Sequence, residues 1–255
     1  MKLPFPKEHK VYVAAHRGNS DHYWENTMTA FRSAIEAGAD MVETDVHLTK
    51  DDVPVLIHDD TVDRTTDGHG RVADYTYAEL CRLNAGDPYG FEPIPRLEEL
   101  LELLSGTDVL LNLEFKEYDR DGNRARCEKC IRLAVELCEK YHMTDKMVFN
   151  SFDYHVLHYI HEHYGPGFRL HGFYPYDKMF NVEGDPGDIL FCACLPYGKD
   201  TSMFDDLPRR GIEMWMPTRT RMQNMLKFYA EHGCTLITTN NVPDAIAKLE
   251  ALGYR

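Results

Sequence analysis

The stretch Met41-Val-Glu-Thr-Asp-Val-His47 decides the fold of this chain and points to its chemistry. It is typical of a short strand, and side chains alternate faces along a strand, so Glu43 and Asp45 project the same way. Two neighbouring carboxylates repel each other unless a cation lies between them. Mg²⁺ or Ca²⁺ is the cation that such oxygen ligands favour. The stretch therefore predicts a strand that carries a divalent-metal site at its end.

A third carboxylate occurs in the same setting, in the run Asp108-Val-Leu-Leu-Asn-Leu-Glu-Phe-Lys116. Its alternation predicts a strand with leucines and a phenylalanine on one face, and with Glu114 and Lys116 on the other. Taken alone, Glu114 and Lys116 are equally consistent with an ion pair on a solvated strand face. The metal hypothesis is stronger because further histidines and cations also fall at predicted strand ends.

Predicted strands and helices alternate along the whole chain. The expected strands are Val11–Ala15, Met41–His47, Val53–Ile57, Val109–Lys116, Met147–Asn150, Phe168–Phe173, Ile189–Leu195, Glu213–Met216 and Thr235–Thr238. The expected helices are Glu25–Gly38, Arg96–Leu104, Asn123–His142, Tyr154–His163, Met203–Arg210, Arg221–His232 and Asp244–Leu252.

Alternation of this kind predicts parallel strands joined by helical crossovers, and eight such repeats close into a (β/α)8 barrel, the TIM barrel. The 255 residues suit one such domain, with an insertion at approximately 59–95, where turn signals interrupt the pattern after the second strand. The rival fold is an open, doubly wound sheet. That fold usually has a glycine-rich first turn, which Gly18-Asn-Ser-Asp21 does not match.

Composition excludes several classes of function. The formal net charge of −14 makes a nucleic-acid backbone or an anionic membrane surface an unfavourable partner. No apolar run is long enough to span a bilayer, and the first residues lack the apolar core of a signal peptide. We therefore expect a cytoplasmic protein with no stable membrane insertion. This composition still permits a small-molecule substrate whose phosphate is bound by a few well-placed cations.

The seven cysteines do not indicate a disulfide framework, because their number is odd. Cys127 and Cys130 have the spacing of a zinc or redox pair. They also belong to an apolar stripe at helical spacing, where a thiol packs as a small hydrophobe. We interpret them as helix core, because no matching second pair occurs.

With these motifs in place, the chain resembles the glycerophosphodiester phosphodiesterases. The resemblance is dense and ordered over residues 12–152. It is carried by His16-Arg17-Gly18, Glu25-Asn26-Thr27, Glu43-Thr-Asp-Val46, Thr49-Lys-Asp-Asp52, His58-Asp59, Thr65-Thr66, Gly68-His-Gly70, Asn112-Leu-Glu-Phe-Lys116 and Ser151-Phe152.

Membership of that family implies a TIM barrel with a small insertion after the second strand. It also implies hydrolysis of a phosphodiester, typically to glycerol 3-phosphate and an alcohol, with one divalent cation, Mg²⁺ or Ca²⁺. The roles of the family carry over residue by residue to this chain: metal ligands at Glu43, Asp45 and Glu114, catalytic histidines at His16 and His58, and phosphate-binding cations at Arg17 and Lys116.

The C-terminal half departs from the family pattern. The family's Trp-Thr-x-Asn stretch is Trp215-Met-Pro-Thr218 here, its closing Thr-Asp-x-Pro is Thr239-Asn-Asn-Val-Pro243, and Trp24 replaces a usual proline. These positions lie where the alcohol part of a substrate would bind. Trp215 is accordingly a candidate for the substrate rim, although core packing explains it as well.

Phosphodiester cleavage needs charge neutralisation, a base and an acid, and two histidines suit the proton transfers because their pKa lies near neutrality. We favour His16 as base and His58 as acid. The nucleophile is either water or the neighbouring glycerol hydroxyl, which would benefit from proximity. Two alternatives remain: a related phosphodiesterase acting on a lysophospholipid or another diester, and a non-catalytic barrel that binds anionic metabolites.

Overall fold

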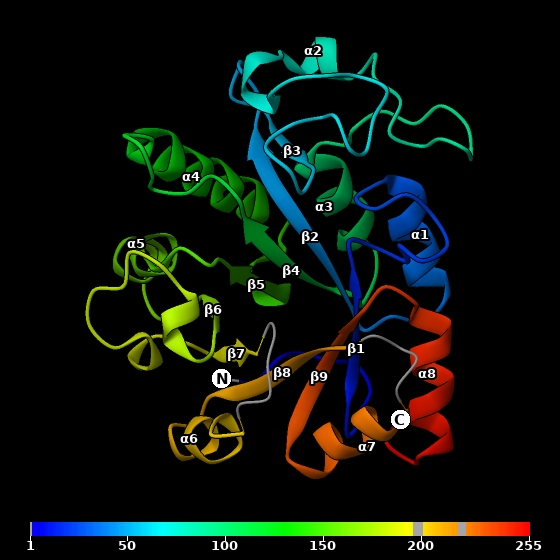
Figure 1. Cartoon of the computed structure of the whole chain (residues 1–255), viewed down its shortest axis with the longest axis vertical. Coiled ribbons are helices and arrows are strands. Elements are labelled where there is room, and N and C mark those ends of the chain that lie inside the picture. The colour runs from blue at the N-terminus through cyan, green and yellow to red at the C-terminus, as the bar shows by residue number, and fades with distance from the viewer. Residues whose placement is uncertain (1, 196–200, 219–222) are drawn as a thin grey trace.

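Eight parallel strands close into a barrel in the computed structural model, which describes residues 2–195, 201–218 and 223–255 (Figure 1). The neighbours run in the order β1, β9, β8, β7, β6, β5, β4, β2, and β1 pairs again with β2 to close the ring. A ninth strand, β3, pairs antiparallel with β2 and lies outside the closed ring. The strands are β1 (Tyr12–His16), β2 (Met41–Leu48), β3 (Pro54–Leu56), β4 (Leu110–Phe115), β5 (Met147–Asn150), β6 (Arg169–Phe173), β7 (Cys192–Cys194), β8 (Glu213–Thr218) and β9 (Cys234–Thr239).

Helices form the connections between these strands and surround the barrel, as the TIM-barrel prediction expects. The described α-helices are α1 (Met28–Glu36), α2 (Tyr77–Leu80), α3 (Leu97–Ser105), α4 (Arg124–Lys140), α5 (Tyr154–Tyr164), α6 (Met203–Arg209), α7 (Gln223–Glu231) and α8 (Val242–Ala251). The predicted start of one helix at Arg221 lies outside the described residues. None of the described helices has the length and apolar character that crossing a membrane requires.

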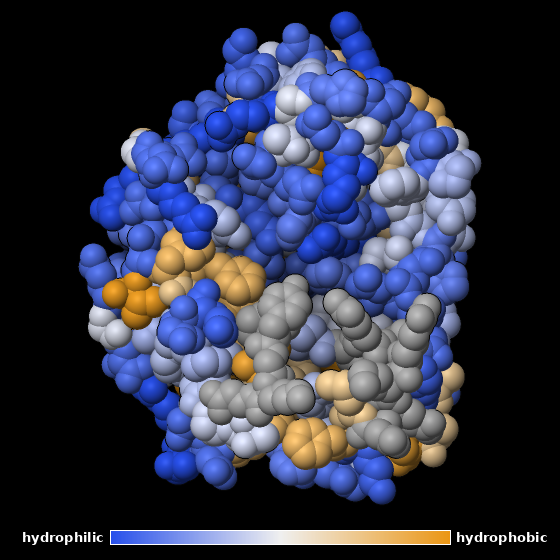
Figure 2. Space-filling model, viewed as in Figure 1, coloured by the Kyte–Doolittle hydropathy of each residue, from blue (hydrophilic) through white to orange (hydrophobic). Residues whose placement is uncertain are grey.

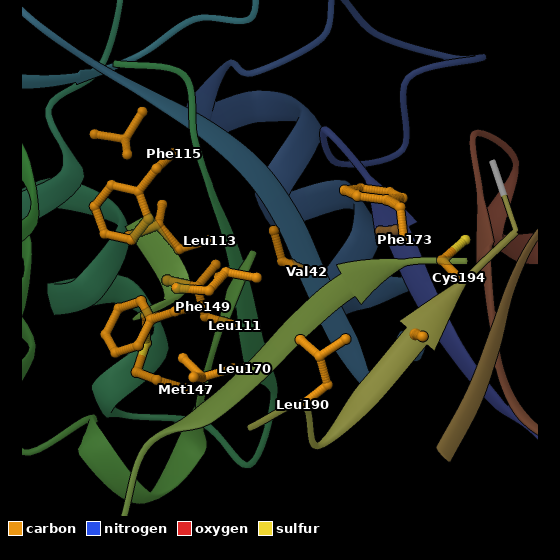
Figure 3. Packing of buried hydrophobic residues seen from close by; sticks show 14 of the residues in the cluster. Val42, Leu111, Leu113, Phe115, Met147, Phe149, Leu170, Phe173, Leu190 and Cys194 are labelled. Carbon is orange, nitrogen blue, oxygen red and sulfur yellow. The ribbon is translucent and has the colours of Figure 1, made fainter. Parts of the chain in front are cut away.

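Two apolar cores follow from the alternation of side chains along the strands. Outward-facing residues such as Val42 and Leu113 pack with the helices in a large outer core, part of which is drawn in Figure 3. Inward-facing residues such as Met41, Leu110 and Trp215 form a smaller core inside the barrel. Because the residues of β2 alternate strictly, Glu43 and Asp45 share the inner face with Met41.

The segment between β2 and α3 builds a small cluster of its own. Figure 1 shows it in cyan to teal at one end of the molecule, with β3 and α2. Its core contains Val55, Ile57, Val62, Val72, Leu80, Ala85 and Ile94. This cluster gives the predicted insertion an apolar centre of its own beside the end of β2. The same segment contains His58.

The predicted helical stripe of cysteines is confirmed: Cys127, Cys130 and Cys138 are fully buried along α4, and all three are free thiols. Burial raises the pKa of each of these thiols, so they remain protonated. This state is the opposite of a reactive or metal-binding thiolate. The core interpretation of the Cys127–Cys130 pair therefore agrees with the structure.

Candidate active site at the carboxyl ends of the barrel strands

Three carboxylates converge at the carboxyl ends of β2 and β4. Glu43, Asp45 and Glu114 each place one ligand oxygen within 4.8 Å of the others, and all three residues are buried. The register explains the convergence, because Asp45 stands directly opposite Glu114 in the pairing of β2 with β4. Asn150 follows on β5, opposite Glu114, and its amide donates to Glu114 Oε2 at 3.4 Å.

Two cations neutralise part of this cluster. The Lys116 amine lies 3.2 Å from Asp45 Oδ1 and also contacts Glu114. On the other side, Arg17 Nε lies 3.2 Å from Asp45 Oδ2, an oxygen that also accepts a 2.9 Å hydrogen bond from Asn26. The predicted phosphate-binding residues, Arg17 and Lys116, therefore flank the acidic cluster from opposite sides of Asp45.

The electrostatics of the cluster are unbalanced as it stands. Burial raises the pKa of Glu43 well above its usual range, and the charges of Asp45 and Glu114 raise it further. Burial also raises the pKa of Glu114, although Lys116 opposes this effect. For Asp45, Lys116 and Arg17 outweigh the effect of burial and lower the pKa. With all three acids ionised, the two flanking cations would leave one negative charge uncompensated, and the raised pKa of Glu43 reflects this repulsion.

This donor set fits a divalent cation. All ligands are oxygens, which is the chemistry of Mg²⁺ and Ca²⁺. Asp45 Oδ1 is buried and, beside its 3.2 Å ion pair with Lys116, accepts no well-aligned hydrogen bond from the described residues, so it can also serve as a metal ligand. Among the described residues, this is the group of carboxylates whose oxygens lie close enough to share one ion.

His16 lies at the end of β1, on the rim of the cluster. Its Nε2 is 4.0 Å from Glu43 Oε2, and its Nδ1 is 2.7 Å from Asn240 Oδ1, which follows β9. This contact makes Nδ1 the donor and leaves Nε2 without a proton in the neutral ring. Burial lowers the pKa of His16, and the charge of Arg17 lowers it further, so the imidazole is neutral at pH 7.

His58 approaches from the β2–α3 segment and is fixed by a carboxylate. Its Nδ1 is 2.6 Å from Asp59 Oδ1, and Ile57 N donates to the Asp45 carbonyl at 3.2 Å, which holds this segment against β2. Burial lowers the pKa of His58, whereas the charge of Asp45 and the hydrogen bond with Asp59 act to raise it. The structure therefore places both predicted histidines beside the same acidic cluster.

The backbone after β1 is shaped to bring Arg17 into place. Arg17 has a φ of 57° and Gly18 a φ of 82°, and Arg17 N donates to Glu43 Oε2 at 3.0 Å. A Cβ on Gly18 would lie 2.7 Å from atoms of Ala30 in α1. Glycine is therefore required here both for its backbone angle and for the close approach of the helix.

Trp215 does not lie on the exposed rim, which corrects its predicted position. It stands in the middle of β8, its side chain is 0% exposed, and it packs inside the barrel with His171 at a ring distance of 5.0 Å. The strand continues to Thr218, beyond the predicted end at Met216. Trp215 therefore lies deeper in the barrel than predicted, and its side chain packs in the inner core rather than lining the substrate site.

Several site residues escaped the sequence analysis as functional groups. Tyr118 follows the end of β4, two residues after Lys116, and the charges of Lys116, Glu114 and Asp45 act on its half-buried phenol. It packs edge-on against Phe180 at 5.0 Å. Glu25, Arg64 and Asn240 hold the site residues by hydrogen bonds, and only their contacts across the fold reveal these roles.

Hydrophilic side chains dominate the surface of α1 and the β2–α3 segment, which lie beside the acidic cluster. Figure 2 shows them over its upper half, where α1 and the β2–α3 segment lie, while apolar side chains gather to the left and below. The site is thus bordered by polar loops.

The family model described as "Glycerophosphoryl diester phosphodiesterase family" matches residues 16–181. A "Glycerophosphodiester phosphodiesterase" of Caldanaerobacter subterraneus subsp. tengcongensis is 41% identical over 154 residues, which cover 58% of this chain and 60% of that relative. The human "Glycerophosphodiester phosphodiesterase 1" is 44% identical over 122 residues, covering 46% of this chain and 37% of that relative. The chain thus matches less than two thirds of the length of these curated relatives.

Solved structures resemble the whole barrel. An Oleispira antarctica phosphodiesterase in complex with the product sn-glycerol-3-phosphate superposes with a TM-score of 0.81 at 26% identity, over 94% of this chain and 96% of that one. A glycerophosphoryl diester phosphodiesterase homologue from Silicibacter pomeroyi gives a TM-score of 0.83 at 23% identity, over 97% of this chain and 95% of that one. The second likeness supports the fold alone.

Proposed function

The chain belongs to the glycerophosphoryl diester phosphodiesterase family, and we propose on that premise that it hydrolyses small glycerophosphodiesters to glycerol 3-phosphate and an alcohol. The observation that carries the proposal is the convergence of Glu43, Asp45 and Glu114 within 4.8 Å, flanked by two histidines and two cations. A site that only binds an anion does not need a pair of proton-transfer groups.

Glu43, Asp45 and Glu114 would hold one Mg²⁺ or Ca²⁺ ion, which supplies Lewis-acid polarisation of a phosphate oxygen when bound. Arg17 would bind the phosphate with its planar guanidinium, and Lys116 would contribute a compact charge on the other side of Asp45. Together these two cations would offset the negative field of the three acids toward an anionic substrate.

The two histidines have different partners, which supports different roles. His16 binds the neutral amide oxygen of Asn240 and has a lowered pKa, so it suits the base that takes a proton from the nucleophile at Nε2. Burial lowers the pKa of His58 as well, but the carboxylate of Asp59, 2.6 Å from its Nδ1, opposes this effect and favours the charged imidazolium, so His58 suits the acid that protonates the leaving oxygen. Both water and the adjacent glycerol hydroxyl are compatible with this arrangement.

The test is hydrolysis of sn-glycero-3-phosphocholine, with choline and glycerol 3-phosphate identified as products, in Mg²⁺, in Ca²⁺ and after removal of metal by a chelator. We expect turnover with at least one ion and its loss with the chelator. His16→Ala and His58→Ala should each lower kcat by about 10²- to 10⁴-fold, because each removes a general acid or base.

The matched control is His69→Ala, since His69 is an 87% exposed histidine in the same molecule whose ring pairs, among the described residues, with Asp63. It should retain the wild-type rate. Full activity of His16→Ala would refute the assigned chemistry. A folded wild-type enzyme that cleaves only a lysophospholipid from a panel of diesters would replace the proposed substrate class but keep the reaction.

A further inference from the structure

One guanidinium joins two carboxylates at the mouth of the site. Arg64 donates to both oxygens of Asp59, from Nε at 2.6 Å and from Nη2 at 3.1 Å. It also donates to both oxygens of Glu25, from Nη1 at 2.9 Å and from Nη2 at 2.7 Å. Such two-sided, bidentate pairing fixes the direction of both carboxylates, which single ion pairs do not.

Each of these carboxylates in turn holds a residue of the proposed machinery. Asp59 Oδ1 is 2.6 Å from His58 Nδ1, and Glu25 Oε1 accepts from Arg17 Nη1 at 2.9 Å. Arg17 then reaches Asp45 in the acidic cluster. A continuous chain of polar contacts therefore runs from one imidazole, through Arg64, to the phosphate-binding arginine.

The chain of contacts connects two segments that the barrel strands do not fix. Arg64 and Asp59 come from the β2–α3 segment, which is an elaboration at the end of β2, whereas Glu25 belongs to the loop between β1 and α1. His58 and Arg17 thus stand on separate loops. Their relative position depends on contacts between those loops, among which the two Arg64–Glu25 hydrogen bonds are short and directional.

We propose that Arg64 is a positioning residue that sets His58 and Arg17 relative to each other on the substrate. The proposal rests on the proposed function. Through Asp59, Arg64 holds the ring of His58 so that Nε2 faces away from Asp59; through Glu25, it holds the guanidinium of Arg17 beside the acidic cluster. The hydrogen bonds from Arg64 lower the pKa of Asp59 to about 2, so Asp59 is ionised whenever the protein is folded near neutrality.

Arg64 is suited to testing because its side chain is 44% exposed, and Asp59 is 28% exposed. Exposed ion pairs contribute little to folding, so removal of Arg64 should perturb the site more than the fold. The matched control is Arg71 of the same segment, which pairs with Asp60 at 3.9 Å, where both side chains are about two-thirds exposed (66% and 67%).

The experiment measures kcat and KM for sn-glycero-3-phosphocholine, with the melting temperature, for Arg64→Ala, Arg64→Lys and Arg71→Ala. We expect Arg64→Ala to lower kcat/KM by about 10- to 100-fold, because small displacements of reacting groups are costly. Arg64→Lys should recover little, since an ammonium cannot pair with two carboxylates bidentately. Added guanidinium should restore part of the activity of Arg64→Ala, and Arg71→Ala should stay within twofold of wild type.

The variants Asp59→Asn and Glu25→Gln test the two contacts of Arg64 one at a time. We expect Asp59→Asn to lower mainly kcat and Glu25→Gln to raise mainly KM, whereas Arg64→Ala does both. Adding Arg64→Ala to either variant should cost less than it does in the wild type, because the shared contact is already lost. A general loss of structure would instead lower the active fraction without this division between kcat and KM.

The proposal fails if Arg64→Ala is as active as wild type, or if its effects add fully to those of Asp59→Asn and Glu25→Gln. If Arg64→Ala does not fold, Arg64→Lys decides, since a folded Arg64→Lys variant with the wild-type kcat and KM would overturn the positioning role. An inactive wild-type enzyme would sink the proposed function itself. If the wild-type enzyme is active and Arg64→Ala is equally active, only the positioning role of Arg64 is refuted.

Discussion

Glu43 and Asp45 are two residues apart on one strand, yet their pKa values move in opposite directions. Both are buried, so burial raises both. The difference lies in their neighbours: Asp45 contacts the side chains of Lys116 and Arg17, whereas Glu43 accepts a hydrogen bond from the backbone N–H of Arg17. Two carboxyl groups on the same face thus have pKa shifts of opposite direction, because the side chains of Arg17 and Lys116 contact Asp45 and not Glu43.

Gly18 provides a test at the level of one residue. Gly18→Ala should reduce the free energy of unfolding by about 1 kcal/mol for the left-handed backbone angle, and by about 1–3 kcal/mol more for the contact with Ala30, where the added Cβ would lie 2.7 Å from helix atoms. Denaturant unfolding measures the change.

Gly122→Ala is the matched control for Gly18→Ala. Gly122 has a φ of 80°, close to the 82° of Gly18, but an added Cβ would meet nothing within 4 Å. Its substitution should therefore cost only the backbone contribution. Equal losses in the two variants would show that the packing of Gly18 against α1 adds nothing to stability.

At the scale of elements, a buried polar network ties the end of β2 to the start of α4. Glu117 accepts from Leu48 N at 3.0 Å and from Arg126 Nε at 3.0 Å, and it lies 3.4 Å from His47 Nδ1. His47 also reaches the carbonyl of His58 at 3.3 Å. The network therefore connects the carboxyl ends of β2 and β4 with the segment that carries His58.

This network predicts a dependence of stability on pH. Hydrogen bonds from His47 and Arg126 outweigh burial and lower the pKa of Glu117 to about 2. A lowered carboxyl pKa stabilises the fold above the unfolded value, near 4.3, and this stabilisation is lost as the pH falls toward 2. We expect Glu117→Gln to cost on the order of 3 kcal/mol at pH 7, and the gap to wild type to narrow by roughly 2 kcal/mol at pH 3.

Urea unfolding at the two pH values measures the gap. The control is Glu136→Gln on α4, the helix that carries Arg126, because Glu136 is 59% exposed and pairs only loosely with Arg132 at 3.8 Å. Its effect should stay within about 0.5 kcal/mol at both pH values. A gap for Glu117→Gln that does not change with pH would contradict the assigned ionisation of Glu117.

At the scale of the whole molecule, the distribution of negative charge predicts that a divalent metal stabilises the fold. The chain carries a formal net charge of −14, and three of its acids are buried within 4.8 Å of one another. Folding must therefore bring like charges together at the carboxyl end of the barrel. A divalent ion that binds only the folded state relieves this repulsion and shifts the folding equilibrium toward the native protein.

We accordingly expect Mg²⁺ or Ca²⁺ to raise the melting temperature, independently of any activity. At a concentration of about 100 times Kd, the gain is roughly 2.7 kcal/mol, which corresponds to several degrees in a domain of this size. Glu43→Gln should reduce the shift, whereas Glu102→Gln, at an exposed helix position, should keep it. An equal shift in both variants would place the ion elsewhere.

Much of the barrel could be predicted because its signals are local. The alternation in Met41–His47 put Glu43 and Asp45 on one face of their strand. The alternation in Asp108–Lys116 put Leu111 and Leu113 on the face opposite to that of Glu114, and the structure agrees. The strand predicted at Met147–Asn150 has the same bounds in the structure. Element ends were less accurate, as at β8, because the pairing with β9 extends that strand to Thr218.

By itself, the sequence determined the alternating elements and the faces of the strands, since these follow from spacing along a continuous segment. The set of three candidate metal ligands, Glu43, Asp45 and Glu114, came from the resemblance of its motifs to a known family. Only the tertiary structure decided that Asn240 meets His16 from 224 residues away, that Arg64 joins Asp59 to Glu25, and that Trp215 packs inside the barrel. Such contacts arise when the sheet closes and its loops meet, and the spacing within one element carries no record of which loops become neighbours.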